Sequence, residues 1–156
     1  MVAVAISVIA LGLAGWAALR SDDSRGESSG TATSFTNTQH EEAKTKLCAA
    51  FSTVRKGVSL NTNASPPGGP EDVTGSLAVA ANARLSMAAG GQYLLARIDP
   101  ATPAELADEA RDFANALLDI GAMAISGIPT SDPVQADRMK TAESLSLSLA
   151  ARCGQR

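Results

Sequence analysis

The segment DPATPAELADEARDFANALLDIGAMAISG, residues 99–127, carries the clearest folding signal of this 156-residue chain. Asp99-Pro100 ends one helix, and Thr102 to Glu105 opens the next with a capping box that has a proline at the first helical position. Apolar residues then recur at intervals of four and three, so they share one helix face: Leu106, Ala110, Phe113, Leu117, Ile120 and Ala124. The segment therefore predicts an amphipathic helix that ends near Gly127 and packs against neighbouring helices.

Three further segments carry helix start signals and an apolar face. The first covers about 38–60 and opens with a capping box at Thr38 to Glu41, the second starts at Pro70, and the last starts at Asp132-Pro133. Their expected inner faces are, in order, Leu47, Phe51, Val54 and Val58; Leu77, Ala81, Leu85, Ala88, Leu95 and Ile98; and Met139, Ala142, Leu145, Leu149 and Cys153. Because alanine is abundant and aromatic residues make up only 3% of the chain, we expect an all-α fold.

Two adjacent glycines, Gly90 and Gly91, lie inside the second predicted helix, where each costs roughly 1 kcal/mol relative to alanine. The pair marks either a kink or a close crossing by another helix, and the alanine-rich composition favours the crossing. We consider a groove between helices near this pair, and the further candidates to line it are the polar residues Asn82, Arg84, Gln92, Tyr93 and Asn115. The alternative is that these polar side chains face water or form hydrogen bonds between helices.

The first nineteen residues, MVAVAISVIALGLAGWAAL, contain no charged residue. They are long enough to cross roughly 30 Å of hydrocarbon, so residues 1–19 are predicted to be a transmembrane helix in the lipid bilayer. A cleaved secretory signal is the alternative, although it normally has a basic start and a clear cleavage site. Residues 20–37, rich in Ser, Thr, Gly and Asp, predict a flexible polar linker to one folded domain over residues 38–156.

The two cysteines, Cys48 and Cys153, determine the expected sidedness. In an up-down four-helix bundle the start of the first helix and the end of the last lie at the same end, so the two residues are expected to form a disulfide. Disulfides persist in oxidising compartments, which predicts an extracytoplasmic domain; two buried free thiols are the alternative. Arg20 and Arg25 follow the apolar segment and argue for the opposite side, a conflict that a cytoplasmic leader absent from this sequence would explain.

Residues with catalytic or metal-binding chemistry are sparse in this sequence. His40 is the only histidine, and Asp108 and Asp112 share one helix face beside Arg111, where a solvated helix start is the simpler interpretation. Two cysteines and one histidine match no zinc pattern, so neither a metal nor a cofactor is expected. A net charge of −3 without a basic stripe argues against nucleic acid as a partner.

The chain resembles the actinobacterial, chiefly mycobacterial, conserved alanine- and proline-rich membrane proteins. The resemblance rests on KTKLCAAFSTVRKGVSLNTN (44–63), LAVAANARLSMAAGGQYLLARIDPATPAELA (77–107) and FANALLDIGAMAISG (113–127). It implies a cell-envelope location and a proline-rich cytoplasmic leader before the membrane helix, which is not present in this sequence. It implies no activity and no catalytic residues.

Together these features predict a membrane-anchored cell-envelope protein rather than an enzyme. Our first hypothesis is a non-catalytic binding or scaffold domain that acts as an accessory subunit of a membrane complex with a protein partner. An exposed apolar strip on the folded domain would favour it. The second hypothesis is a helical receptor or carrier for an envelope lipid or small apolar ligand, which requires a sizeable pocket.

Overall fold

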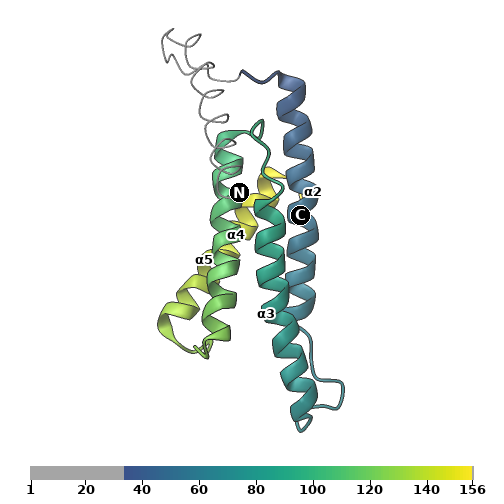
Figure 1. The fold of residues 1–156 in the computed structure, drawn as a ribbon, viewed down its shortest axis with the longest axis vertical. Coiled ribbons are helices and arrows are strands. Elements are labelled where there is room, and N and C mark those ends of the chain that lie inside the picture. The colour runs from purple at the N-terminus through teal and green to yellow at the C-terminus, as the bar shows by residue number, and fades with distance from the viewer. Residues whose placement is uncertain (1–33, 156) are drawn as a thin grey trace, which may run out of the picture. The chain divides into compact units, whose positions relative to one another are not determined.

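The computed structural model describes residues 34–155, and these fold into four helices. In chain order they are α2 (Asn37–Thr62), α3 (Val73–Leu95), α4 (Ala104–Ile125) and α5 (Pro133–Arg152). Successive helices run in alternating directions (Figure 1), and the predicted all-α class with four helices in this part of the chain is confirmed. The predicted transmembrane helix at 1–19 and most of the predicted linker at 20–37 lie outside the described residues. None of the four helices is both long and apolar enough to cross a membrane.

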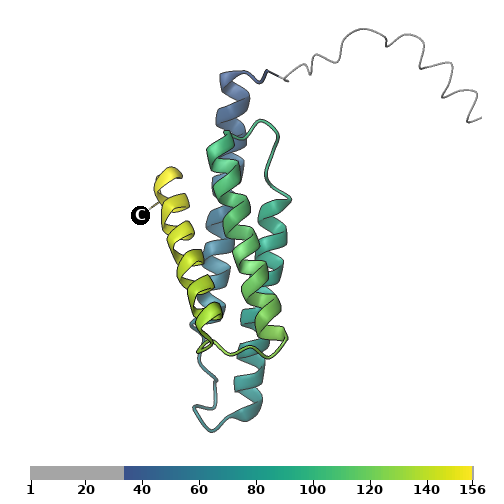
Figure 2. The same ribbon diagram turned by 90° about the vertical axis from the view of Figure 1, so that its left-hand side faces the viewer.

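Each helix packs mainly on the next helix in the chain. The extensive contacts join α2 to α3, α3 to α4 and α4 to α5, whereas α2 and α5 meet in only a few places. Figure 2 shows α5, in yellow, lying against α4 at an angle to the other helices. The domain is therefore an open four-helix arrangement, in which the first and last helices do not pack along their length as they would in a closed bundle.

The core is centred on the apolar face of α4. All but one of the residues predicted for this face are buried, namely Leu106, Ala110, Phe113, Leu117 and Ile120, whereas Ala124 is half-buried. From α2, Leu47, Phe51 and Val54 meet this face as predicted. The rings of Phe51 and Phe113 pack edge to face at 5.6 Å between centroids, an arrangement favoured by the aromatic quadrupole.

The predicted inner face of α3 is wrong in its first half, whereas Leu95 and Ile98 pack against the core as predicted. Leu77 and Leu85 are 66% and 64% exposed, and the buried residues of this helix are Met87, Gly91 and Leu94. The helix is apolar around most of its circumference, so the spacing of leucines does not identify one face. α3 instead contacts its neighbouring helices at small residues such as Gly91.

The helix starts agree with the sequence in one case and differ in three. Asp132 caps α5 with Pro133 in the first turn, as predicted. The capping box of α2 uses Thr36 with Gln39 instead of Thr38 with Glu41, and α3 begins at Val73 behind an Asp72 cap instead of at Pro70. For α2 an equally good capping residue lies two positions before the predicted one, and α3 starts three residues after the predicted Pro70; sequence spacing alone does not resolve such shifts.

The predicted capping box at the start of α4 is absent. Pro103 is the N-cap residue and no side chain caps this helix. The hydroxyl of Thr102 is buried and has no hydrogen-bond partner, although Thr102 and Glu105 have the expected spacing. Pro103 fixes the backbone entry angle, so the helix starts without the side-chain bond.

The glycine pair in α3 marks a close helix crossing, as favoured from the sequence. A Cβ added at Gly91 would lie 2.8 Å from the carbonyl oxygen of Ala114 and 2.7 Å from Cγ of Leu118, both on α4. A Cβ at Gly90 would lie 2.9 Å from a methyl carbon of Val54 on α2. Since α3 is continuous through both residues, the pair lets α3 approach two neighbours closely.

We predict that Gly91→Ala destabilises the domain by about 1 to 3 kcal/mol, because the new methyl group overlaps backbone and side-chain atoms of α4. Gly57→Ala is the matched control, since nothing lies within 4 Å of a Cβ at that helical position. It should stabilise the domain by up to about 1 kcal/mol. Urea unfolding of both variants measures the difference, and equal stabilities would contradict the close crossing.

Candidate binding groove

An apolar recess of the described domain lies where α5 diverges from α2. We call it the α2–α5 groove; its volume is about 680 Å³ and it is open on one side. The floor is formed by one face of α4, and α2, α3 and α5 form the walls. Its lining residues are mostly apolar, and those used below are Met87, Phe113, Leu117, Ile120, Met139 and Leu147.

This groove explains two exposed apolar residues of α5. Met139 and Leu147 are 42% and 59% exposed, and both line the groove. Met139 was predicted to lie on the inner face of its helix together with Ala142 and Leu149, and those two residues are buried. The periodicity of α5 therefore identifies the correct face, but part of that face borders an open recess instead of another helix.

Polar groups in the groove are few and unevenly distributed. Arg55 of α2 and Arg84 of α3 are the basic lining residues, and Glu143 of α5 is the only acidic one. Within residues 34–155, the ion pairs found involve none of these three side chains. The two guanidinium groups are therefore available to an anionic group that enters the groove.

Gln135 is a fully buried polar residue on the groove wall. Its Nε2 donates a hydrogen bond of 3.0 Å to the carbonyl oxygen of Ile120, which fixes the start of α5 against α4. Its Oε1 is buried without a hydrogen-bond partner. A buried acceptor left unpaired costs about 1 to 3 kcal/mol of stability.

Of the residues considered for a groove from the sequence, Arg84 lines this one and the others do not. Gly90 and Gly91 are packed against neighbouring helices, and Asn82 and Gln92 are exposed on the surface of α3. Tyr93 lies under the guanidinium of Arg97, 4.6 Å from the ring centroid. Together with Lys46 and Asp99 it borders a second hollow, in which polar surface has a larger share.

His40 has a structural contact in this domain. Its Nδ1 donates a hydrogen bond to the carbonyl oxygen of Ala101, and its ring meets that of Phe35 edge-on. The contact joins the first turn of α2 to the loop between α3 and α4. His40 is half-buried.

The acidic residues at the start of α4 follow the simpler interpretation. Asp108 forms an exposed ion pair of 2.6 Å with Arg111, and Asp112 is exposed. Within the described residues, no group of three or more His, Cys, Asp or Glu side chains could hold a metal ion. The cluster is thus a solvated helix start.

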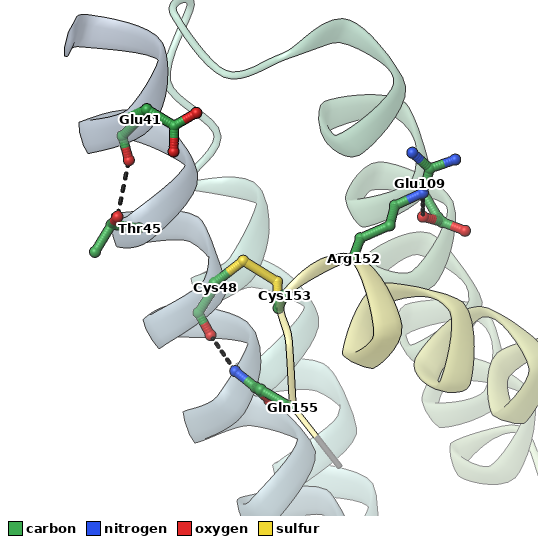
Figure 3. Close-up of a disulfide and its surroundings, with 7 residues drawn as sticks. All are labelled: Glu41, Thr45, Cys48, Glu109, Arg152, Cys153 and Gln155. Carbon is green, nitrogen blue, oxygen red and sulfur yellow. Dashed lines mark hydrogen bonds and ion pairs between the residues drawn. A yellow bond between two sulfur atoms is a disulfide. The ribbon is translucent and has the colours of Figure 1, made fainter.

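The disulfide predicted from the sequence is present. Cys48 and Cys153 are bonded with their Cα atoms 5.5 Å apart, and Figure 3 shows that the bond joins α2 to the end of α5. Gln155 adds a hydrogen bond of 3.0 Å from its Nε2 to the carbonyl oxygen of Cys48. Gly154, with φ of 65°, makes the tight turn that brings Gln155 back to α2.

Arg152 adds a contact that sequence analysis missed. Its guanidinium lies 2.7 Å from a carboxylate oxygen of Glu109 and 3.1 Å from one of Glu105, so the end of α5 is held to α4 as well as to α2 (Figure 3). Opposite charges at a helix end and a helix start are a weak sequence signal, because such pairs are common on surfaces. The groove thus lies beside an anchored end of α5.

Comparison with known proteins adds no relative. No family model matches the chain, and neither the curated proteins nor the solved structures contain a match. The described residues are therefore characterised by their own structure. They form an open four-helix domain with a disulfide at one end and an apolar recess between α2 and α5.

We predict that the double variant Cys48→Ala/Cys153→Ala loses up to about 4 to 5 kcal/mol of stability. The bond spans 105 residues and restricts the unfolded chain, and it also joins the two helices that otherwise share few contacts. Arg152→Ala is the control at the same helix end and should cost about 1 kcal/mol or less, since this ion pair is partly exposed. Urea unfolding measures both; similar losses would contradict the role of the disulfide.

Proposed function

We propose that the domain is a non-catalytic receptor that binds an apolar molecule in the α2–α5 groove. The observation that carries the proposal is the groove itself, an apolar recess of about 680 Å³ bordered by all four helices. Small-molecule sites are typically concave, largely apolar and 300 to 1,000 Å³ in volume, with a few polar groups that orient the ligand. Arg55, Arg84 and Glu143 provide such polar groups.

A location at the cell envelope, with residues 1–19 as a membrane anchor, is part of this proposal. The disulfide supports an extracytoplasmic domain, because such bonds persist where thiols are not kept reduced. The resemblance to actinobacterial envelope proteins points the same way. A receptor held near a bilayer is well placed to receive apolar molecules from it.

The groove can be tested with a photoreactive residue. We predict that benzoylphenylalanine at position 139, on the groove wall, gives light-dependent adducts with small apolar molecules in native membranes. The control is the same residue at position 141, which is exposed but is not among the groove-lining residues. Mass spectrometry of the full chain identifies the adducts, and equal adduct yields at positions 139 and 141 would contradict the proposal.

A scaffold role with a protein partner is the second candidate, and an exposed apolar strip on α3 favours it. Val73, Leu77 and Leu85 are 64% to 71% exposed. They are four and eight residues apart in α3, so their side chains fall on one side of the helix. Leucines exposed in this way are typical of surfaces that bind another protein. In this role the domain would be an accessory subunit of a membrane complex.

The scaffold role predicts the loss of a partner when the strip is made polar. Leu77→Ser/Leu85→Ser should change stability by about 0.5 kcal/mol or less per site, since both side chains are exposed. A protein that copurifies in fixed ratio with the full chain should be absent from this variant and retained by Val134→Ser, the control on α5. Retention by both variants would exclude the strip as the binding surface.

A further inference from the structure

We propose that the first half of α3 binds the same region of a second copy of this chain, in an antiparallel pair with two-fold symmetry. The inference names the partner that the scaffold role requires, so it rests on that role and not on a ligand in the α2–α5 groove. It follows from three properties of residues 73–83, which we call the α3 arm: its position in the domain, its surface and the charges at its ends.

Most of the α3 arm extends past the ends of the neighbouring helices. A Cβ added at Gly121 of α4 would lie 3.6 Å from the carbonyl oxygen of Arg84, and α4 ends four residues later at Ile125. Thr62, the last residue of α2, borders the groove together with Arg84, so α2 ends near the same level. Because α3 runs antiparallel to both helices, its start projects beyond them, as Figure 1 shows at the lower end of the domain.

The surface of the arm is apolar and uncharged. Its sequence, VTGSLAVAANA, contains no Asp, Glu, Lys or Arg, and none of its residues is buried. Val73 and Leu77 are 71% and 66% exposed. An isolated helix of this length is only marginally stable in water, and exposed apolar surface of this kind marks a contact site. We therefore expect the arm to pack against a partner.

A partner outside the bilayer fits the position of the arm. The arm and the start of α2 lie at opposite ends of the domain (Figure 1), and α2 is about 39 Å long at 1.5 Å per residue. The start of α2 is the end through which the domain is joined to residues 1–19, the proposed anchor. The arm is therefore at the end of the domain that is not attached to the anchor.

The charges at the two ends of the arm are opposite in sign. Glu71 and Asp72 precede the arm, and Arg84 follows it. Among the residues that the structure describes, the ion pairs found involve none of these three side chains. A parallel pair of arms would place like charges together, whereas an antiparallel pair brings Arg84 of each copy near Glu71 of the other. Because like charges across an interface are costly and opposite ones fix its register, the antiparallel pair is favoured.

A two-fold axis at Leu77 also makes the apolar surfaces complementary. Residues equally far before and after Leu77 then lie opposite each other, so Val73 of one copy meets Ala81 of the other. A large side chain opposite a small one lets two helices interdigitate. In a symmetric pair this contact occurs twice, with the two Leu77 side chains between. The same axis brings Arg84 and Glu71 together, since they are seven and six residues from Leu77.

The pair is expected to be weak in dilute solution. The arms overlap from Glu71 to Arg84, about 20 Å at 1.5 Å per residue. So short an interface lies at the low end of the size range of specific complexes. Attachment of both copies to one membrane raises their effective concentration, so the association is best measured there.

The test uses two full chains with different affinity tags, coexpressed and kept in native membranes. One copy carries benzoylphenylalanine at position 81 on the arm, and the control carries it at position 134, an exposed position on α5. After irradiation, purification through both tags isolates adducts between copies, and mass spectrometry identifies the joined peptides. We expect position 81 to give adducts with the arm of the second copy and position 134 to give none.

Charge reversal tests the antiparallel orientation. Arg84→Glu, or Glu71→Arg, in both copies places like charges at both ends of the pair and should lower the adduct yield from position 81 at least about fivefold. When one copy carries Arg84→Glu and the other carries Glu71→Arg, opposite charges face each other again and the yield should recover. This recovery also shows that both variants fold. Lys140→Glu, an exposed reversal on α5, is the control and should leave the yield unchanged.

The outcomes separate the second copy from the scaffold role itself. Adducts from position 81 with a different protein would overturn the second copy as partner and keep the scaffold role. Adducts between copies that persist at full yield after Arg84→Glu would overturn the antiparallel pair. Adducts from position 81 with neither a second copy nor another protein would overturn both the pair and the scaffold role.

Discussion

The Cys48–Cys153 bond is the constraint on which the shape of this domain depends. It attaches the end of α5 to the middle of α2, two helices that share few other contacts. The attachment is at the end of α5 only. Towards its own start, α5 therefore diverges from α2 and packs along α4 instead. The recess between α2 and α5 forms because the disulfide holds the two helices together at the end of α5, whereas they do not pack side by side towards its start.

The remaining stability comes from α4, which contacts α2, α3 and α5. Phe51 of α2 and Leu149 of α5 pack in the core with its buried face, and α3 approaches α4 closely at Gly91. Burial of each large side chain contributes about 1.5 to 3 kcal/mol, so this helix holds the arrangement together even where α2 and α5 separate. The part of this face formed by Phe113, Leu117, Ile120 and Ala124 also lines the groove.

The sequence predicts those features that depend on local pattern. The stripe from Leu106 to Ile120 predicts the face of α4, because large apolar residues alternate there with charged ones. The face of α3 is not predictable in this way, since alanines surround the helix and packing is decided by where Gly91 fits against α4. Gln135 was missed, although its position four residues before Met139 places a polar side chain on an apolar face, which is a usable signal.

The groove itself could not be predicted, because it depends on the angle between α5 and its neighbours rather than on any one segment. Helices that pack at a small angle would bury Met139 and Leu147 against α2 and leave no recess. The divergence of α5 is stabilised at its start by Gln135 on Ile120 and at its end by Arg152 on Glu109. Both contacts attach α5 to α4, whereas the bonds between α5 and α2 lie only at the end of α5. Polar contacts with α4 at both ends of α5 therefore leave the apolar recess between α5 and α2 open.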